Sequence, residues 1–540
     1  MGNATTMLSL VDEDNVDVRA YQLLSRPQRP QTPDLLIALT PGSAPSPPSE
    51  IHQTTAATLI QSTPSPNMPA NLCDLDATEA RRLIGERKLS SVDLVEACIA
   101  RIEAVNPKIN AVVTTAYDRA RVEAKAADEA IAQGKPLGLL HGMPVLVKDL
   151  NRTEGIRTTF GSPLFKDNVP TSDDFLVARL RKHGAIILGK TNTPEFGTGS
   201  NTKNRVFGTS CNPFNTKLTP GGSSGGSGAA LAANMAPLAT GSDSGASIRN
   251  PAAFNGIAGI RPSPGLIANP ERSHGLSTNG VEGPLGRTVA DVTLLLAAMA
   301  EYDPRDMMSR PIDPSIFLTL KPVDVAGLRV GISEDLGFAP IDKVVRETFR
   351  RKMETISGAF ALCEDSGTNM KGAEEAYMGV RALHLLSGNS ARYREHGKDL
   401  DKNLVWNIED ALNKTPTQYA EAVAEQTRIH REFQSVFEKY DVLITPACNV
   451  LPFEHTTLFP ATIEGRPAAH YCEWFSILYG ISLIGHPAIS LPAGLDPQGT
   501  PFGIQVVGSR FGDLRLLEVA KALESLLASN TETQRPKADL

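Results

Sequence analysis

Leu218-Thr-Pro-Gly-Gly-Ser-Ser-Gly-Gly-Ser-Gly228 and, after an alanine-rich run, Gly241-Ser-Asp-Ser-Gly-Ala-Ser-Ile-Arg-Asn-Pro251 are two clusters of serine and glycine. Glycine permits a positive φ and the close approach of other groups. Successive backbone N–H groups in such turns form concave nests for negative charge. Serine adds a nucleophile or a proton carrier, so this stretch has the composition of a reaction centre that other parts of the chain must complete.

Length and composition indicate a large globular protein, since 41% of the 540 residues are hydrophobic, 21% are charged and the net charge is −7. A weakly acidic chain lacks the basic face of a general nucleic-acid binder. No apolar run approaches the ~20 residues that span a bilayer. The six cysteines include no C-x-x-C pair and therefore indicate no zinc site or disulfide framework. We expect a cytoplasmic protein with no nucleic-acid partner, no membrane association and no metal.

The first 67 residues differ in composition from the rest of the chain. Ten prolines fall between Pro27 and Pro69, among serine and threonine and with little periodic apolar patterning. Such a segment cannot bury enough surface to offset its ordering entropy. The Met-Gly start matches an N-myristoylation pattern, but we favour a dispensable, disordered extension over 1–67. We expect a compact catalytic domain over 68–528 and a frayed tail over 529–540.

Amphipathic segments alternate with short apolar runs through the compact part. This alternation predicts an α/β fold with a largely parallel sheet covered by helices on both faces. A long charged segment over 370–440 predicts a helical excursion over the sheet. The expected helices are 76–84, 90–107, 116–133, 173–183, 341–356 and 513–527, and the expected strands are 145–147, 185–188, 328–332, 442–444, 488–491 and 502–507.

Several short motif matches fail in their context. Residues 184–191 fit the P-loop pattern, but the intervening residues are apolar and strand-like where a phosphate loop is needed. Residues 200–203 match S-x-x-K without a K-T-G companion, and residues 221–225 match G-x-S-x-G after a Thr-Pro turn rather than a strand. No histidine has a convincing triad context. A lysine that ends a buried strand, Lys148, and the two serine clusters remain.

Lys148 could activate a serine only as a neutral amine. At pH 7 an ordinary lysine, with a pKa of about 10.4, costs about 4.6 kcal/mol to deprotonate. Burial after Val145-Leu-Val147 would lower that cost. From residue types alone, the alternative that Lys148 is exposed or salt-bridged stays open.

The motifs together resemble the amidase signature family of serine hydrolases, in order and over most of residues 76–527. The resemblance implies that family's fold, a large twisted mixed β-sheet covered by helices on both faces. A Gly-Gly-Ser-Ser-Gly-Gly-Ser run with a second serine at this spacing is highly specific. The matching segments are 142–149, 189–196, 220–227, 243–249, 283–288, 485–494 and 503–508.

The resemblance implies roles for individual residues. Ser247 would be the acylated nucleophile, Ser223 a bridging serine in a cis peptide bond, and Lys148 the neutral base. No metal or organic cofactor is implied. The oxyanion hole would be formed by the backbone N–H groups of Ser244, Gly245 and Ala246 with that of Ser247, and Asp243 and Arg249 would support the loop.

Two features bear on substrate choice. Ala246 stands where the family usually has glycine, which keeps the N–H donor but adds a Cβ. Arg261-Pro-Ser263 and Trp406-Asn-Ile-Glu409 resemble the bacterial branch that hydrolyses aryl amides, carbamates and 6-aminohexanoate cyclic dimer. We expect hydrolysis of a small-molecule amide, carbamate or anilide through an acyl-enzyme. The alternatives are the catalytic subunit of a tRNA-dependent glutamine amidotransferase and an inactive binding protein; a homodimer stays open.

Overall fold

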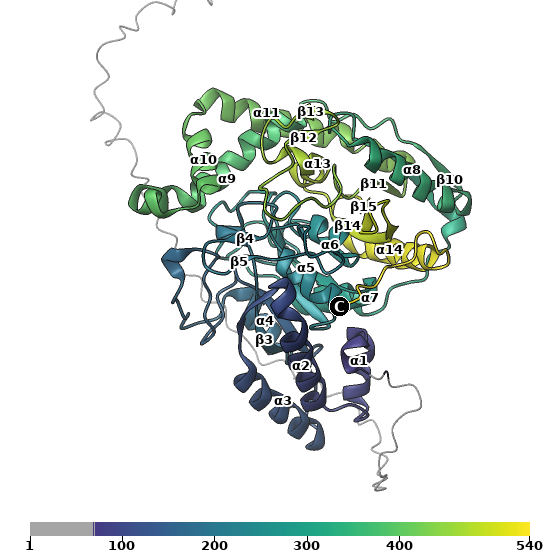
Figure 1. Cartoon of the computed structure of the whole chain (residues 1–540). Helices are drawn as coiled ribbons and strands as arrows, with labels where there is room; N and C mark the ends of the chain where they lie inside the picture. The colour runs from purple at the N-terminus through teal and green to yellow at the C-terminus, as the bar shows by residue number, and fades with distance from the viewer. Residues whose placement is uncertain (1–68, 70) are drawn as a thin grey trace, which may run out of the picture. The chain divides into compact units, whose positions relative to one another are not determined.

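A computed structural model describes residue 69 and residues 71–540, so the predicted extension over 1–67 and the myristoylation pattern lie outside the described residues. The centre is an eleven-stranded sheet (Figure 1). Its strands, in spatial order, are β1 (Val112–Thr115), β3 (Ile186–Thr191), β2 (Pro144–Lys148), β6 (Leu238–Asp243), β8 (Val281–Gly286), β7 (Ala258–Arg261), β14 (Ala488–Leu495), β15 (Pro501–Val507), β11 (Val442–Pro446), β9 (Arg329–Ile332) and β10 (Leu362–Asp365).

The sheet is mixed, as the family resemblance implies. Strands β3, β2 and β6 run parallel, and so do β11, β9 and β10. The middle of the sheet, from β6 through β8, β7, β14 and β15 to β11, is antiparallel throughout. The expectation of a largely parallel sheet is therefore wrong for the middle. A strand that is buried on both faces is a continuous apolar run whether it pairs parallel or antiparallel with its neighbours. Its composition therefore does not predict the direction of pairing.

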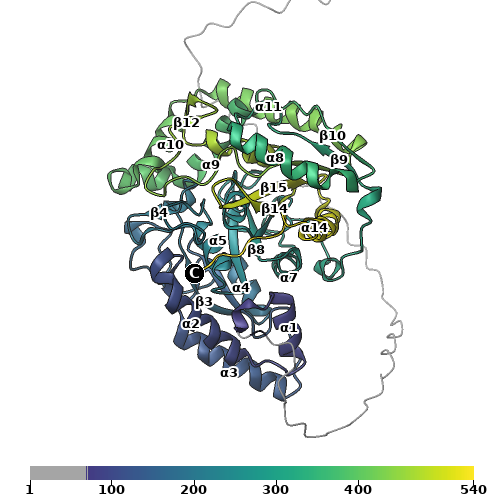
Figure 2. The same cartoon turned by 45° about the vertical axis from the view of Figure 1, so that its right-hand side comes forward.

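Helices lie on both faces of this sheet (Figures 1 and 2), and most of the predicted helices and strands are present. Four very short strands lie in loops: β4 (Lys203–Asn204), β5 (Gly208–Thr209), β12 (Thr462–Ile463) and β13 (Arg466–Pro467). The helices are α1 (Ala77–Gly85), α2 (Ser91–Ile109), α3 (Tyr117–Ala132), α4 (Phe175–Lys182), α5 (Gly225–Ala232), α6 (Arg249–Asn255), α7 (Val289–Met299), α8 (Lys343–Ile356), α9 (Ala373–His396), α10 (Lys402–Leu412), α11 (Pro416–Phe433), α12 (Val436–Lys439), α13 (Ser476–Ile484) and α14 (Asp513–Ala528).

The predicted helical excursion over 370–440 consists of α9 to α12. Helix α9 packs against α10, α11 and α13, and so carries side chains from the excursion toward the centre of the protein. Within the described part of the chain, no helix combines the length and the apolar character needed to cross a bilayer.

Two segments test other sequence-based expectations. The P-loop match forms strand β3, as its apolar residues predict, and Lys190 Nζ donates to Thr153 Oγ1 at 2.7 Å inside the protein. The C-terminal tail is not frayed. Thr533 is fully buried, Arg535 Nε donates to the Gly256 carbonyl at 3.0 Å, and Leu540 packs against the core. These last residues are held by specific contacts with distant parts of the chain, which local composition does not reveal.

Candidate active site

Lys148 is the last residue of β2, and its side chain is completely buried. Its Nζ lies 2.8 Å from Ser223 Oγ, 2.9 Å from Ser224 Oγ and 2.9 Å from Ser242 Oγ. The predicted lysine at the end of a strand is therefore buried, and it meets the first serine cluster directly. Three hydroxyl groups surround the amine.

This environment lowers the pKa of Lys148. Burial is the largest cause and brings the pKa to about 7, although Glu282 and Asp243 act in the opposite direction. A neutral amine has two N–H donors and one lone pair. It can therefore donate to two of the surrounding hydroxyl groups while its lone pair accepts the proton of a third, such as Ser223.

Ser223 follows a cis peptide bond, Gly222–Ser223, as the family resemblance implies. A side chain at position 222 would not fit, because its Cβ would lie 2.8 Å from the carbonyl carbon of Ser200. Helix α5 begins two residues later. The backbone N–H of Ser224 donates to the carbonyl oxygen of Ser247 at 3.2 Å, which ties the first serine cluster to the second.

Ser247 lies in the short loop between β6 and α6, and a buried ion pair holds that loop. Arg249 Nε donates to Asp243 Oδ2 at 3.0 Å, and both side chains are fully buried. Arg249 also donates to the Gly245 carbonyl at 2.8 Å, while Asp243 accepts from the Ile248 N–H at 3.2 Å. Both ends of the loop are thus fixed by the residues for which we predicted a supporting role.

Arg261, at the end of β7, is a third member of this charge cluster. Its Nη1 lies 3.3 Å from Asp243 Oδ1 and 2.5 Å from the Asp243 carbonyl oxygen. Burial would raise the pKa of Asp243, but Arg249 and Arg261 outweigh it and bring that pKa to about 2. The sequence pointed to Arg261 only as a branch similarity, because its contact with Asp243 depends on how the strands assemble.

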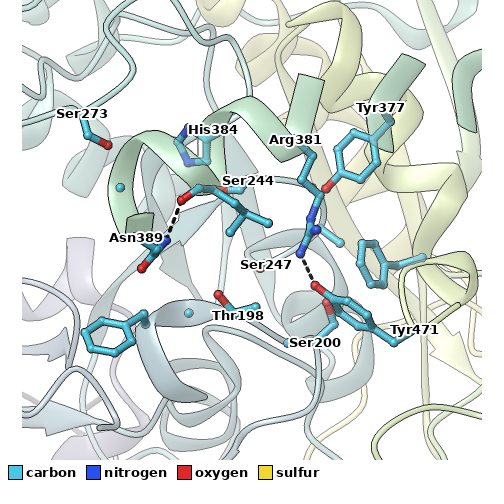
Figure 3. Close-up of a pocket in the computed structure, with 18 residues that line it drawn as sticks. Thr198, Ser200, Ser244, Ser247, Ser273, Tyr377, Arg381, His384, Asn389 and Tyr471 are labelled. Atoms are coloured by element: carbon cyan, nitrogen blue, oxygen red, sulfur yellow. Dashed lines mark hydrogen bonds between the residues drawn. The ribbon is translucent and has the colours of Figure 1, made fainter. Parts of the chain in front are cut away.

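The second serine cluster opens onto a cavity of about 140 Å³ (Figure 3). Residues 244–247 form one part of its wall, and the loop over 196–200 forms another. Helix α9 contributes much of the opposite wall, so the excursion reaches the site. The cavity's side chains from α9 and its neighbours include Tyr377, Arg381, His384, Asn389, Tyr471 and Phe475.

Four consecutive backbone N–H groups face no protein acceptor here. Within residues 71–540, the N–H groups of Ser244, Gly245, Ala246 and Ser247 donate to no backbone or side-chain oxygen, whereas the N–H of Ile248 is bound to Asp243. Residues 244–247 all line the cavity. Such a row of free donors is suited to a developing negative charge.

The alanine at position 246 is accommodated without strain. Ala246 is 1% exposed, and it is absent from the positive-φ residues of the described chain. The neighbouring glycine has no room for a side chain unless Tyr377 moves, since a Cβ on Gly245 would lie 2.3 Å from the hydroxyl oxygen of Tyr377.

Glu282 is a charged group near the lysine that the sequence reasoning missed. It lies on β8 directly opposite Ser242 of β6, and its Oε2 is buried with no hydrogen-bond partner in the described residues. Burial, followed by the charge of Asp174, raises the pKa of Glu282 to about 7, while Lys148 opposes the shift. Only the register of the sheet reveals this neighbour.

The mixed sheet with a lysine and two serine loops at its centre defines an enzyme of the amidase signature family. The family model described as "Amidase" matches residues 93–517, and the chain belongs to this family.

The proteins to which this chain is similar are named for different activities. The chain is 34% identical to the A subunit of the glutamyl-tRNA(Gln) amidotransferase of Dehalococcoides mccartyi, over 86% of this chain and 99% of that protein. In structure it is similar to a bacterial aryl acylamidase, with a TM-score of 0.78 and 29% identity over 84% of this chain and 96% of the other. It is also similar to 6-aminohexanoate cyclic dimer hydrolase, with a TM-score of 0.73 and 27% identity over 85% and 98% of the two chains.

Proposed function

We propose that this protein hydrolyses a carbon–nitrogen amide bond through an acyl-enzyme on Ser247. The observation that carries the proposal is the buried Lys148 amine, which has a pKa of about 7 and lies 2.8 Å from Ser223 Oγ. A base poised near neutral pH is what proton abstraction from a serine requires.

The first half of the reaction forms the acyl-enzyme. Neutral Lys148 accepts the proton of Ser223, and Ser223 takes the proton of Ser247 as the Ser247 oxygen bonds to the amide carbon. The resulting oxyanion is bound by the free N–H groups of residues 244–247, each worth roughly 10²–10³ in rate. When the carbon–nitrogen bond breaks, the same relay returns the proton to the leaving nitrogen, and the amine departs.

The second half releases the acid. A water molecule gives its proton to the Ser223–Lys148 relay while its oxygen attacks the acyl carbon. Collapse of this intermediate returns the proton to Ser247 and frees the carboxylic acid. All of these steps use groups of the chain and water.

Labelling with a fluorophosphonate tests this proposal, because the reagent phosphonylates an activated serine. Mass spectrometry should find the label on Ser247, and Ser247→Ala should not be labelled. Ser387→Ala, an exposed serine on α9, is the matched control and should label at the wild-type rate. Labelling elsewhere, or none in folded protein, would refute the assignment of the nucleophile.

Substrate type is the finer part of the proposal. Similarity to the aryl acylamidase supports anilides, and similarity to the cyclic dimer hydrolase supports lactam-derived amides, with carbamates as a further class. Release of aniline, amine or alcohol from such compounds by purified protein distinguishes among them.

A second candidate is the catalytic subunit of a glutamine amidotransferase, because the chain spans 99% of a relative with that name. Ammonia release from glutamine, measured with gel filtration of the same sample, separates the two candidates. A lone chain that hydrolyses anilides and ignores glutamine favours the hydrolase.

A further inference from the structure

Arg381, on helix α9, projects into the cavity that contains Ser247 (Figure 3). Its Nη1 donates to Asn407 Oδ1 at 2.5 Å, and its Nη2 donates to the hydroxyl oxygen of Tyr471. The guanidinium also lies 5.4 Å from the centre of the Tyr471 ring. These contacts hold the side chain from two sides.

Both of these partners are neutral. Asn407 is 1% exposed and its own amide donates to the Asn403 carbonyl at 2.6 Å, so its Oδ1 is turned toward Arg381. Asp410 acts on Arg381 from helix α10, but its carboxylate is paired with Lys414 at 3.0 Å. Among residues 71–540, no carboxylate forms an ion pair with Arg381. The arginine is fixed in place without being neutralised.

The rest of the cavity wall offers no counter-charge. None of its lining residues is Asp or Glu. The histidine on the wall, His384, is neutral at pH 7 because burial lowers its pKa to about 4. Arg381 is partly buried. A guanidinium stays charged in proteins and has five N–H donors, and partial withdrawal of a charge from water without a countercharge is costly. An anionic ligand would remove that cost.

We propose that Arg381 determines specificity by binding a carboxylate carried by the amide substrate. The inference rests on the hydrolase function proposed above and names the substrate class for that site. Charge-assisted pairing between a guanidinium and a carboxylate is strong and directional. A volume of about 140 Å³ corresponds to roughly five water molecules, which limits the substrate part at this wall to a short chain or one ring.

Two matched pairs of substrates test the proposal. Glutaryl p-nitroanilide and pentanoyl p-nitroanilide have acyl groups of equal length with and without a carboxylate. 4-Acetamidobenzoate and acetanilide differ by a carboxylate on the amine side. In at least one pair, kcat/KM should favour the acid by about tenfold to a hundredfold, the effect of a hydrogen bond to a charged group.

Variants on one helix separate charge recognition from structure. Arg381→Gln should bring the favoured acid-to-neutral ratio close to one, and Arg381→Lys should keep part of it. Arg394→Gln removes the same charge from an exposed position of α9 and should leave the ratio unchanged. If Arg381 only supports the fold or the reaction in general, Arg381→Gln will slow both members of a pair equally, which would overturn the proposal.

Binding to the Ser247→Ala protein separates failure of this inference from failure of the hydrolase proposal. Calorimetry would compare glutaramate with pentanamide and 4-acetamidobenzoate with acetanilide, none of which requires turnover. Tighter binding of an acid that is lost in Ser247→Ala/Arg381→Gln supports the carboxylate site even if Ser247 is not the nucleophile. Equal binding within both pairs, or preference for the neutral member in both, overturns it.

Discussion

Lowering the pH from about 9 to about 5 is expected to remove nearly all acyl transfer to Ser247, because Lys148 takes a proton only as a neutral amine. With the pKa of Lys148 at about 7, the neutral fraction is about half at pH 7 and roughly 1% at pH 5. Above about pH 8 the rate should level off. An ordinary lysine would instead be only ~0.04% neutral at pH 7, and the rate would climb about tenfold per pH unit up to about pH 10.

The assay is the second-order rate of fluorophosphonate labelling at Ser247 between about pH 5 and about pH 10. Labelling reports the first nucleophilic step and is independent of product release. Thermal unfolding at each pH would show that the protein remains folded. A rate that is flat down to about pH 5 would refute a neutral lysine base, and a rate that rises steadily to about pH 10 would refute the lowered pKa.

The Lys148→Met variant tests whether Lys148 causes this pH dependence of labelling. The loss of the base should reduce labelling by about 10²–10⁴ and remove the acid limb. Lys190→Met is the matched control, since Lys190 is also buried, pairs with Val147 in the sheet and has a pKa lowered by burial to about 8. That variant should lose stability, because buried acceptors lose their donor, yet keep the acid limb near pH 7.

Three further predictions concern the surroundings of the site. Glu282→Gln should shift the acid limb of the labelling profile to lower pH, because the Glu282 charge raises the pKa of the buried lysine; an unchanged or higher limb would contradict the coupling. Gly245→Ala should cut kcat severely, because its Cβ would lie 2.3 Å from the Tyr377 hydroxyl oxygen. Adding Tyr377→Phe should restore part of the loss. A Gly245→Ala enzyme of normal kcat would disprove the clash. Arg249→Met should lower the unfolding free energy by about 3–5 kcal/mol, since it leaves the buried Asp243 carboxylate with one fewer partner. Denaturant unfolding would measure this change. A change below about 1 kcal/mol would show that other groups suffice to stabilise the Asp243 carboxylate.

The sequence predicts the parts of the site that depend on local chemistry. Glycine and serine at 221–228 and 241–247 indicate tight loops with free donors, and the apolar run before Lys148 indicates a buried strand end. Those features are set within a few residues of chain. The family resemblance then assigns the separate roles of the two serines, which composition alone leaves interchangeable.

The rest depends on assembly of distant segments. Glu282 comes near Lys148 only through the pairing of β8 with β6. Arg261 reaches Asp243 through the sheet, and Arg381 reaches the cavity because α9 packs over it. Sheet direction is equally non-local, because β8 lies between β6 and β7, and β15 lies between β14 and β11. Local patterning contains no information on any of these pairings.

The distribution of charge around Lys148 favours the neutral amine that the proposed mechanism requires. Asp243 is close enough to raise the lysine's pKa, but Arg249 and Arg261 pair with it and offset its charge. The amine itself meets hydroxyl groups, which stabilise an ammonium less than a carboxylate would. Glu282 is therefore the nearby carboxylate that is only partly ionised at neutral pH, because its pKa is also raised to about 7. Because two such groups titrate as a pair, the protonation of Lys148 depends in part on that of Glu282. The strength of the proposed base is therefore determined in part by a residue on a different strand.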